Sequence, residues 1–160
     1  MELLFYQSEH DDVLKTFSLP EEQAQFTGLP IEVLDVTLAD PNRHAICIMA
    51  EGVPVGFFVL HERSEEPPTQ NPNALVLRAF SINYIHQGKG YAKAAMKLLP
   101  DFVMRHFPHI DEVVLRVNEK NHAAKQLYVT YGFLDNGLKG MGPIGPQSIL
   151  QMPISTSNKQ

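Results

Sequence analysis

The 160-residue chain fits a single domain, residues 1–160, with one hydrophobic core. Its one cysteine, Cys47, excludes an internal disulfide, and a formal net charge of −5 argues against a surface that binds nucleic acid. The apolar runs are much shorter than the roughly 18 residues of a membrane-spanning helix, and residues 1–12 lack the basic start of a signal peptide, so we expect a cytoplasmic protein without a membrane partner.

Positive charge is concentrated in the middle of the chain. Residues 78–125 contain eight Lys and Arg against four Asp and Glu, a local charge of +4 that leaves −9 for the remainder. The basic middle could suit an anion. The acidic outer segments, SEHDD at 8–12 and PEEQ at 20–23, could suit a cation. Ordinary solvated faces explain the same distribution equally well.

The first third of the chain predicts a strand, short helices and a hairpin. Residues 2–7 favour a strand, and residues 10–26 favour one or two short helices because Pro20 suits a first helical turn. Residues 28–44 are ambiguous, and we interpret them mostly as loop. Two apolar runs around a Glu-Gly pair predict a β-hairpin over residues 44–62.

The middle of the chain predicts a loop, a buried strand and a long helix. Residues 64–73 are polar and proline-rich, which indicates a surface loop, and residues 74–83 form a nearly continuous apolar strand. Apolar residues at three-four spacing then predict a helix from Gly88 to His106. Pro100 lacks a backbone N–H and should bend this helix or end it early.

The last third predicts a strand at 111–118, a helix at 120–133 and two late strands within 137–154. The order of elements is then β, α, β, β, β, α, β, α, β, β. Its β-α-β-α centre implies a right-handed crossover and at least one parallel pair of strands. The sequence therefore predicts an α/β domain.

A glycine-containing loop leads into the long helix. Unpaired N–H groups and the positive dipole end make a helix start an anion site, and Gly88 and Gly90 would let a ligand approach the backbone. A P-loop is excluded because Tyr91 and Ala92 follow Gly90, and a dinucleotide fingerprint would need glycine in place of Lys93. The residues predict a phosphate-capable helix start, with a plain strand-to-helix turn as the alternative.

Two segments resemble the signatures of the GCN5-related N-acetyltransferases, the GNAT family. QGKGYA at 87–92 matches the motif Q/R-x-x-G-x-G/A, and NHAAKQLY at 121–128 with YGF at 131–133 matches the second signature. The resemblance covers roughly residues 45–135. It implies a mixed, mostly antiparallel twisted sheet of about seven strands, with a central parallel pair splayed around the cofactor and about four flanking helices.

The resemblance implies an acyltransferase that moves an acetyl group from acetyl-CoA to a primary amine by direct attack in a ternary complex. Acetyl-CoA would be the co-substrate, without a metal; the histidines have no clear ligand spacing. The acceptor would be a small molecule or peptide, and the acidic segments are compatible with a cationic one. The protein would be a monomer or homodimer. Alternatives are a non-catalytic acyl-CoA sensor of the same fold, or a plain phosphate- or nucleotide-binding domain.

The resemblance also implies cofactor contacts in three segments. The N–H groups of residues 87–92 would hold the CoA pyrophosphate, and residues 80–82 would pair with the pantetheine arm as an added strand. A bulge there would aim an N–H at the thioester carbonyl, and the strand ending at Asn118 would diverge to admit the arm. The implied cofactor-binding residues are Phe80, Ser81, Ile82, Gln87, Gly88, Lys89, Gly90, Tyr91, Ala92, Asn118 and Asn121.

Tyr128 is the catalytic residue that the resemblance implies, as the acid that protonates the leaving thiolate. A tyrosine hydroxyl, with a pKa of about 10, is protonated at neutral pH and can be that donor. Tyr128 and Tyr131 could instead be core aromatics, and Asn121 could be only a helix N-cap. The general base stays open because Arg78 stands where relatives often place an acid. Candidates are Glu22, Glu32, His44, Glu62, a water chain, or an amine that arrives neutral.

Overall fold

The computed structural model describes residues 1–64 and 71–154. It contains one seven-stranded mixed sheet in the order β1-β2-β3-β4-β5-β7-β6. The strands are β1 (Glu2–Phe5), β2 (Arg43–Ala50), β3 (Val53–Glu62), β4 (Ala74–Ile82), β5 (Glu112–Asn118), β6 (Leu134–Gly142) and β7 (Gly145–Pro153). The helices are α1 (Asp11–Leu14), α2 (Glu21–Ala24), α3 (Pro30–Ala39), α4 (Tyr91–His106) and α5 (His122–Thr130), with short 3-10 turns η1 (Ser8–His10) and η2 (Tyr84–His86).

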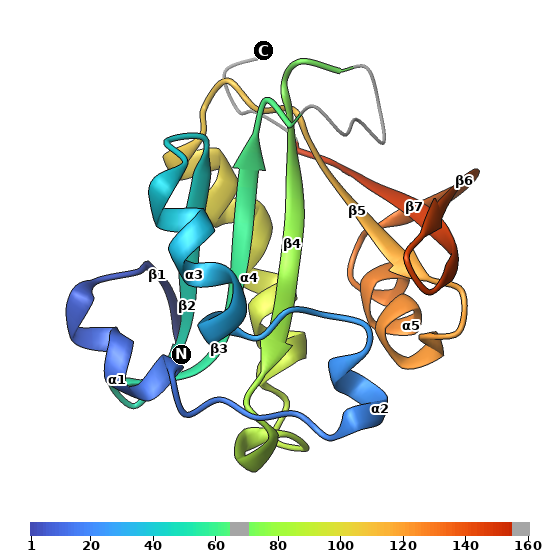
Figure 1. Ribbon diagram of the computed structural model, residues 1–160. Helices are drawn as coiled ribbons and strands as arrows, with labels where there is room; N and C mark the ends of the chain where they lie inside the picture. The colour runs from blue at the N-terminus through green and yellow to red at the C-terminus, as the bar shows by residue number, and fades with distance from the viewer. Residues whose placement is uncertain (65–70, 155–160) are drawn as a thin grey trace.

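Helices cover both faces of the sheet (Figure 1). α4 lies behind β1–β4, and its buried residues Ala95, Met96 and Leu99 join the larger core. On the front face, α1 and α3 cover a smaller core with β2 and β3. Cys47 is buried in the front core, where burial raises the pKa of its thiol to about 12, so it is a packing residue as expected.

The parallel pair β4 and β5 separates along its length. Only the pairs Ala74–Glu112, Leu75–Val113 and Val76–Val114 join the two strands. Beyond them β4 stays paired with β3, while β5 stays paired with β7. Figure 1 shows the two strands leaving one point and spreading apart toward α2. The predicted fold is therefore confirmed, including the splayed central pair.

The interpretation of residues 28–44 as mostly loop is wrong, because α3 spans Pro30–Ala39. Pro30 takes the first helical position, and the Glu32 carboxylate accepts a hydrogen bond of 2.7 Å from the Leu29 backbone N–H. Leu34 and Thr37 face the sheet. The helical periodicity of this segment was obscured in the sequence, because apolar residues also occupy the exposed side of α3, at Ile31, Val36 and Leu38.

The long helix α4 begins at Tyr91 rather than Gly88, and it continues through Pro100 to His106. Of the two effects expected of Pro100, a bend or an early end, the early end does not occur. The residues on both sides of the proline, Leu99 and Phe102, are buried in the larger core. Their burial offsets the cost of about 3 kcal/mol that proline imposes on a helix interior.

No helix in the described ranges is long and apolar enough to cross a membrane.

The predicted hairpin over residues 44–62 is confirmed as β2 and β3, and the two late strands are confirmed as β6 and β7. In the predicted loop over residues 64–73, residues 65–70 lie outside the described residues. The loop leads into β4 at Ala74, where β4 is still paired with Glu112 of β5. The diverging C-terminal ends of β4 and β5 therefore lie at the end of the sheet opposite this loop.

Glu62, at the end of β3, connects two other elements. Its carboxylate lies 2.6 Å from His44 Nε2 on β2 and 2.9 Å from His109 Nε2 after α4. Burial alone raises the pKa of Glu62, but the hydrogen bonds from both histidines outweigh it and hold the pKa below its usual 4.5. The ionised carboxylate therefore stabilises the fold above pH 4.5, and this contribution is lost as the pH falls through the lowered pKa.

We expect Glu62→Gln to lower the free energy of unfolding at pH 7 by about 1–2 kcal/mol, because charge-assisted hydrogen bonds become neutral ones. The difference from the wild type should begin to shrink as the pH falls below 4.5 and should vanish below the lowered pKa, where the folded wild-type carboxyl is itself protonated. Urea unfolding at pH 7 and at pH 3 measures both values. The control is Glu2→Gln at an exposed strand position. An equal loss at both pH values would contradict the ionic role of Glu62.

Candidate functional site

A β-bulge interrupts β4 where that strand leaves β5. The register passes from Val59–Arg78 to Phe57–Ser81, so Ala79 and Phe80 together face a single residue of β3. Ala79 has a φ of 55°, a left-handed conformation that costs a non-glycine residue about 1–2 kcal/mol. Such strain persists only where the surroundings enforce it, and it often marks a functional site.

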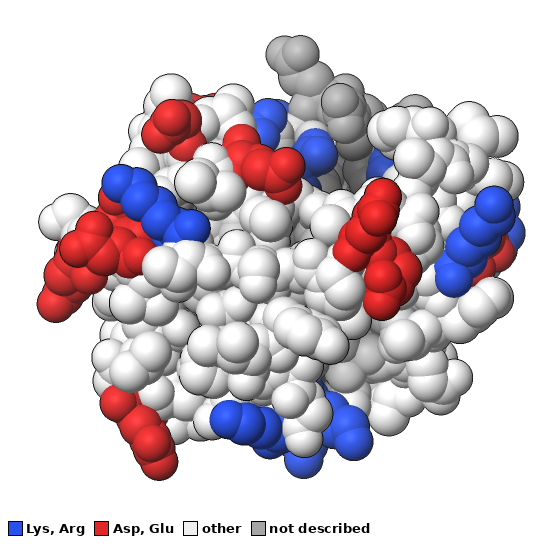
Figure 2. All heavy atoms as spheres, turned by 60° about the horizontal axis from the view of Figure 1, so that its bottom comes forward, with Lys and Arg blue, Asp and Glu red and all other residues white. Residues whose placement is uncertain are grey.

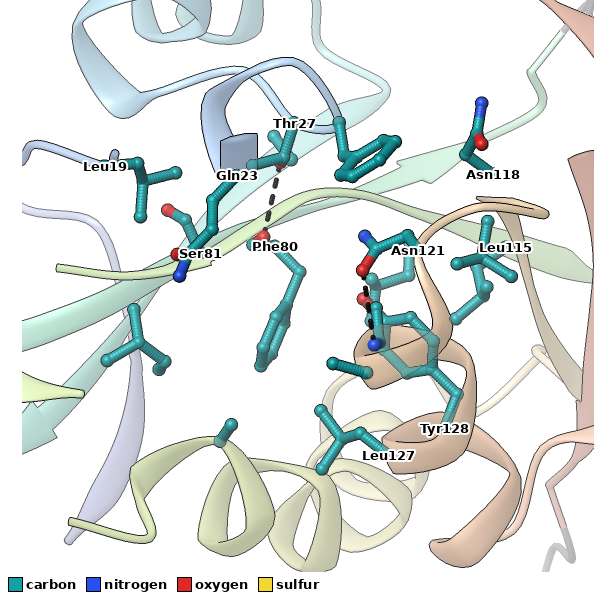
Figure 3. Close-up of a pocket in the computed structure, with 18 of the residues that line it drawn as sticks. Leu19, Gln23, Thr27, Phe80, Ser81, Leu115, Asn118, Asn121, Leu127 and Tyr128 are labelled. Carbon is teal, nitrogen blue, oxygen red and sulfur yellow. Dashed lines mark hydrogen bonds between the residues drawn. The ribbon is translucent and has the colours of Figure 1, made fainter. Parts of the chain in front are cut away.

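Thr27, in the segment between α2 and α3, fixes the bulge from the front face. Its hydroxyl donates a hydrogen bond of 3.3 Å to the Phe80 carbonyl oxygen, drawn as a dashed line in Figure 3. Ser81 follows on β4, and its buried hydroxyl makes no hydrogen bond within the described chain. The bulge therefore places a fixed carbonyl and an unsatisfied hydroxyl side by side on one strand.

The divergence of β4 and β5 opens a groove with a volume of about 1510 Å³. Its walls come from β4 and β5, the starts of α4 and α5, the segment after α2, and the turn between β6 and β7. Figure 3 shows the bulged strand on one side of the opening and α5 on the other. Among the predicted site residues, those that line the groove are Phe80, Ser81, Ile82, Gln87, Gly88, Gly90, Tyr91, Ala92, Asn118, Asn121 and Tyr128. Lys89 does not line it, whereas Lys93 does.

The start of α4 presents a row of unpaired amides to the groove. Gly90 is the N-cap, with a φ of 83°, and Gly88 has a φ of 80°. Within the described part of the chain, no hydrogen bond uses the backbone N–H groups of residues 88–93. An added Cβ would meet no atom within 4 Å at either glycine, so the backbone there is open to a ligand. The amides and the helix dipole together favour an anion.

Gln87 connects this loop to α2 and does not point its amide at the anion seat. Gln87 and Gln23 exchange two hydrogen bonds, of 2.8 and 3.2 Å, and Gln87 also donates to the Ile82 carbonyl oxygen at 3.0 Å. The side chain thereby holds α2, the end of β4 and the glycine loop together. The structure therefore gives the Gln87 side chain a role in shaping the loop, beside the cofactor contact expected of its backbone.

Two asparagines organise the opposite wall. Asn121 is the N-cap of α5, and its side-chain oxygen accepts a hydrogen bond of 3.4 Å from the Ala124 N–H. Asn118, at the end of β5, accepts a bond of 2.9 Å from the Lys120 N–H and donates one of 3.5 Å to the Ile144 carbonyl oxygen. Asn118 therefore connects the end of β5 to the turn between β6 and β7.

Tyr128 places its ring between the two walls. The ring packs edge-on against Phe80 of the bulge, at 6.1 Å between centroids, and against Phe133 at 5.6 Å. Burial raises the pKa of Tyr128 above its ordinary value of 10.0, and its hydroxyl makes no hydrogen bond with any residue that the structure describes. Tyr131 differs: it is half-buried, with the Lys97 ammonium 5.8 Å from its ring centroid. Tyr128 is thus a protonated hydroxyl kept close to the bulge.

Charged side chains line the groove unevenly. Among its described lining residues the cations are Arg78, Lys93 and Arg116, and the only carboxylate is Glu22. Figure 2 shows one group of basic side chains at the lower edge of that view, while the other basic side chains lie closer to acidic ones. The acidic segment at 8–12 does not line the groove.

Of the four side chains considered as general base, Glu22 alone lines the groove. Glu32 caps the start of α3, and His44 and Glu62 bond each other on the far side of β2 and β3. Glu22 lies on α2, which the hydrogen bonds between Gln23 and Gln87 hold against the glycine loop. The fold thus leaves Glu22 as the one carboxylate of the described groove lining.

Sequence reasoning missed the wall formed by the β6–β7 turn. Residues 141–144 and Gln147 line the groove, and the buried Gln147 side-chain oxygen makes no hydrogen bond in the described chain. The glycines and prolines of this segment predict a turn, but nothing in them predicts which strand lies beside it. Arg116 had a usable signal, because it is the one charged residue inside the apolar run VVLRV of β5.

The comparisons agree with this geometry. Residues 7–133 match the sequence model of the Acetyltransferase (GNAT) family. The chain belongs to this family. A relative from Bacillus subtilis (strain 168), called an uncharacterized N-acetyltransferase YbbJ, is 46% identical over 150 residues, which are 92% of this chain and 94% of the relative. The activity class is therefore that of an acetyltransferase.

Solved structures share the fold at low sequence identity. A structure of the aminoglycoside acetyltransferase AAC(6')-Ib with paromomycin and acetyl-CoA has a TM-score of 0.77 at 15% identity, covering 94% of this chain and 92% of that one. A chimera of spermidine N-acetyltransferase SpeG from Vibrio cholerae and hSSAT has a TM-score of 0.70 at 17% identity, covering 96% of both chains. These likenesses establish the fold, and the two proteins act on different amines.

Proposed function

We propose that this protein transfers an acetyl group from acetyl-CoA to a primary amine by direct attack in a ternary complex. The observation that carries the proposal is the open groove between β4 and β5, because both motif segments and the bulge line this one space. A groove at the diverging ends of parallel strands, with unpaired amides at one end, suits an extended molecule that has phosphates at one end.

Different walls of the groove would bind different parts of acetyl-CoA. The amides of residues 88–93 would receive the pyrophosphate, with Lys93 supplying a positive charge in the first turn of α4. The edge of β4 over residues 80–82 would pair with the pantetheine arm in the manner of an added strand. Asn118 and Asn121, on the opposite wall, would contact the same arm.

The reaction then uses three groups of this chain. Glu22 takes a proton from the acceptor ammonium, directly or through water, so that the neutral amine can attack the thioester carbon. A backbone N–H of the bulge at Ala79–Phe80 stabilises the negative charge that develops on the carbonyl oxygen. As the new C–N bond forms and the C–S bond breaks, the Tyr128 hydroxyl gives its proton to the thiolate and later regains one from solvent.

An amine panel assayed with acetyl-CoA tests the proposal. The panel contains amino acids, amino sugars, polyamines, simple alkylamines and peptides with free N-termini. We expect thiol release above the amine-free background for at least one class, together with a product heavier by one acetyl group. Binding of acetyl-CoA in calorimetry without transfer to any amine would contradict the enzyme and favour a sensor with the same fold.

A further inference from the structure

Arg116 lines the groove on the side of the sheet where α2 carries Glu22. Along β5, Val113, Leu115 and Val117 join the core that α4 covers, so Arg116 faces the opposite side of the sheet, where α2 lies. Its side chain is exposed, lines the groove and makes no hydrogen bond or ion pair with any residue in the described ranges. A guanidinium held in a groove without a carboxylate partner is available to an anion.

Gly140 on β6 leaves room for this guanidinium. A Cβ at Gly140 would lie 3.3 Å from Arg116 Nη1 and 3.6 Å from Ile149 Cδ1. The Arg116 side chain therefore crosses β7 and lies against the bare backbone of β6. This contact limits where the guanidinium of Arg116, a residue of the groove lining, can go. The φ of Gly140 is not left-handed, so other residues fit its backbone.

The surroundings of Arg116 favour a ligand that has both charges. Arg78 adds a second guanidinium from β4, and its Nε donates to His61 Nδ1 at 3.2 Å and its Nη2 to Ser64 Oγ at 3.0 Å. Glu22 supplies the one carboxylate of the described lining. A polycation would meet the Arg116 guanidinium here, at a cost of like-charge repulsion.

We propose that the acceptor amine also carries a carboxylate, which Arg116 binds, so that the substrate is an amino acid or a related amino carboxylate. This inference rests on the proposed function and specifies its acceptor. The amine of such a zwitterion points to Glu22 and the thioester, while the carboxylate takes the fork of guanidinium N–H groups that suits it. Arg116 is then a specificity-determining residue whose contribution is lost when the acceptor lacks the acid.

The test compares matched acceptors on the wild type and on Arg116→Gln. Each amino acid, leucine for example, is assayed beside its primary amide and its decarboxylated amine, and spermidine is included. We expect the wild type to have a kcat/KM at least about 10-fold higher for the amino acid. The amide is a stringent comparison, because its amine is less basic and more of it is neutral at a given pH.

Arg116→Gln should lower kcat/KM for the amino acid by about 10- to 100-fold, mainly through KM, and change the decarboxylated amine less than about 2-fold. Gly140→Val should lower kcat/KM for the amino acid by a smaller factor, because it displaces the guanidinium while Arg116 remains. The matched control is Arg105→Gln, an exposed arginine of α4 outside the groove.

Two results would overturn the proposed binding of a carboxylate by Arg116 while leaving the proposed acetyltransferase function intact. One is a wild-type preference for spermidine or the decarboxylated amine, and the other is an equal loss of kcat/KM on all acceptors in Arg116→Gln. Transfer to no amine at all would overturn the proposed function and this inference with it. An unfolded Arg116→Gln would be recognised by circular dichroism. The wild-type preference and Gly140→Val then decide the question.

Discussion

Tyr128→Phe should lower kcat by about 10²- to 10⁴-fold while leaving the affinity for CoA and the stability of the fold nearly unchanged. The variant removes one oxygen from a ring that packs on Phe80 and Phe133, and this oxygen makes no hydrogen bond within the described chain. The loss should therefore appear in the chemical step. Without a proton donor, the thiolate must leave as an anion.

The experiment measures thiol release at saturating acetyl-CoA and calorimetric affinity for CoA in the same preparation. Tyr131→Phe is the matched control, since Tyr131 lies one turn further along α5 but is half-buried beside Lys97. It should retain kcat within about 3-fold, because its hydroxyl is not required for proton transfer. Unchanged turnover in Tyr128→Phe would exclude the acid role, and a parallel loss of CoA affinity would indicate a packing role.

The raised pKa of Tyr128 gives this role a pH signature. Burial favours the neutral phenol, so the hydroxyl keeps its proton up to and beyond the ordinary pKa of 10.0. A group with a raised pKa stays a competent acid as the pH increases. The wild-type kcat should therefore show no decline between pH 8 and pH 10 from loss of the acid, and the low kcat of Tyr128→Phe should follow the same profile.

The fold could be predicted from the sequence wherever one segment carried one clear pattern. The hairpin β2–β3 consists of two apolar runs around a Glu-Gly turn, and α4 has apolar residues on one face, so both follow from the local sequence pattern. α3 did not, because apolar residues occupy its exposed side as well as its buried side. The continuation of α4 through Pro100 could not be predicted from the sequence for a related reason. Only the packed structure shows that buried neighbours hold the helix on both sides of the proline.

The candidate site was predictable where it depends on short-range geometry. Gly88 and Gly90 adopt a left-handed backbone before α4, and Asn121 caps the start of α5, so both local structures follow from the local sequence. The β6–β7 turn lies more than twenty residues beyond β5 in the chain and meets the groove only because β7 inserts between β5 and β6. Arg116 and Gly140 share a wall for the same reason, and no local pattern connects them.

Gly90→Val should reduce the affinity for CoA by at least about 100-fold. Gly90 has a φ of 83°, which costs a non-glycine residue about 1–2 kcal/mol, and its open side faces the row of unpaired amides. A branched side chain there would occupy the seat proposed for the pyrophosphate. Gly90→Ala, with a smaller side chain, should lie between Gly90→Val and the wild type.

The control must carry the same backbone strain away from the groove, and Gly137→Val does. Gly137 has a φ of 84°, lies on exposed β6 and has nothing within 4 Å of an added Cβ. Both valine variants should therefore lose similar stability in urea unfolding, while only Gly90→Val loses CoA affinity in calorimetry. Acetyl-pantetheine, which has no pyrophosphate, distinguishes a blocked pyrophosphate seat from a damaged catalytic groove. Because it does not use the seat at the start of α4, Gly90→Val should turn it over at nearly the wild-type rate, and a large loss there would show that the variant damages the catalytic groove.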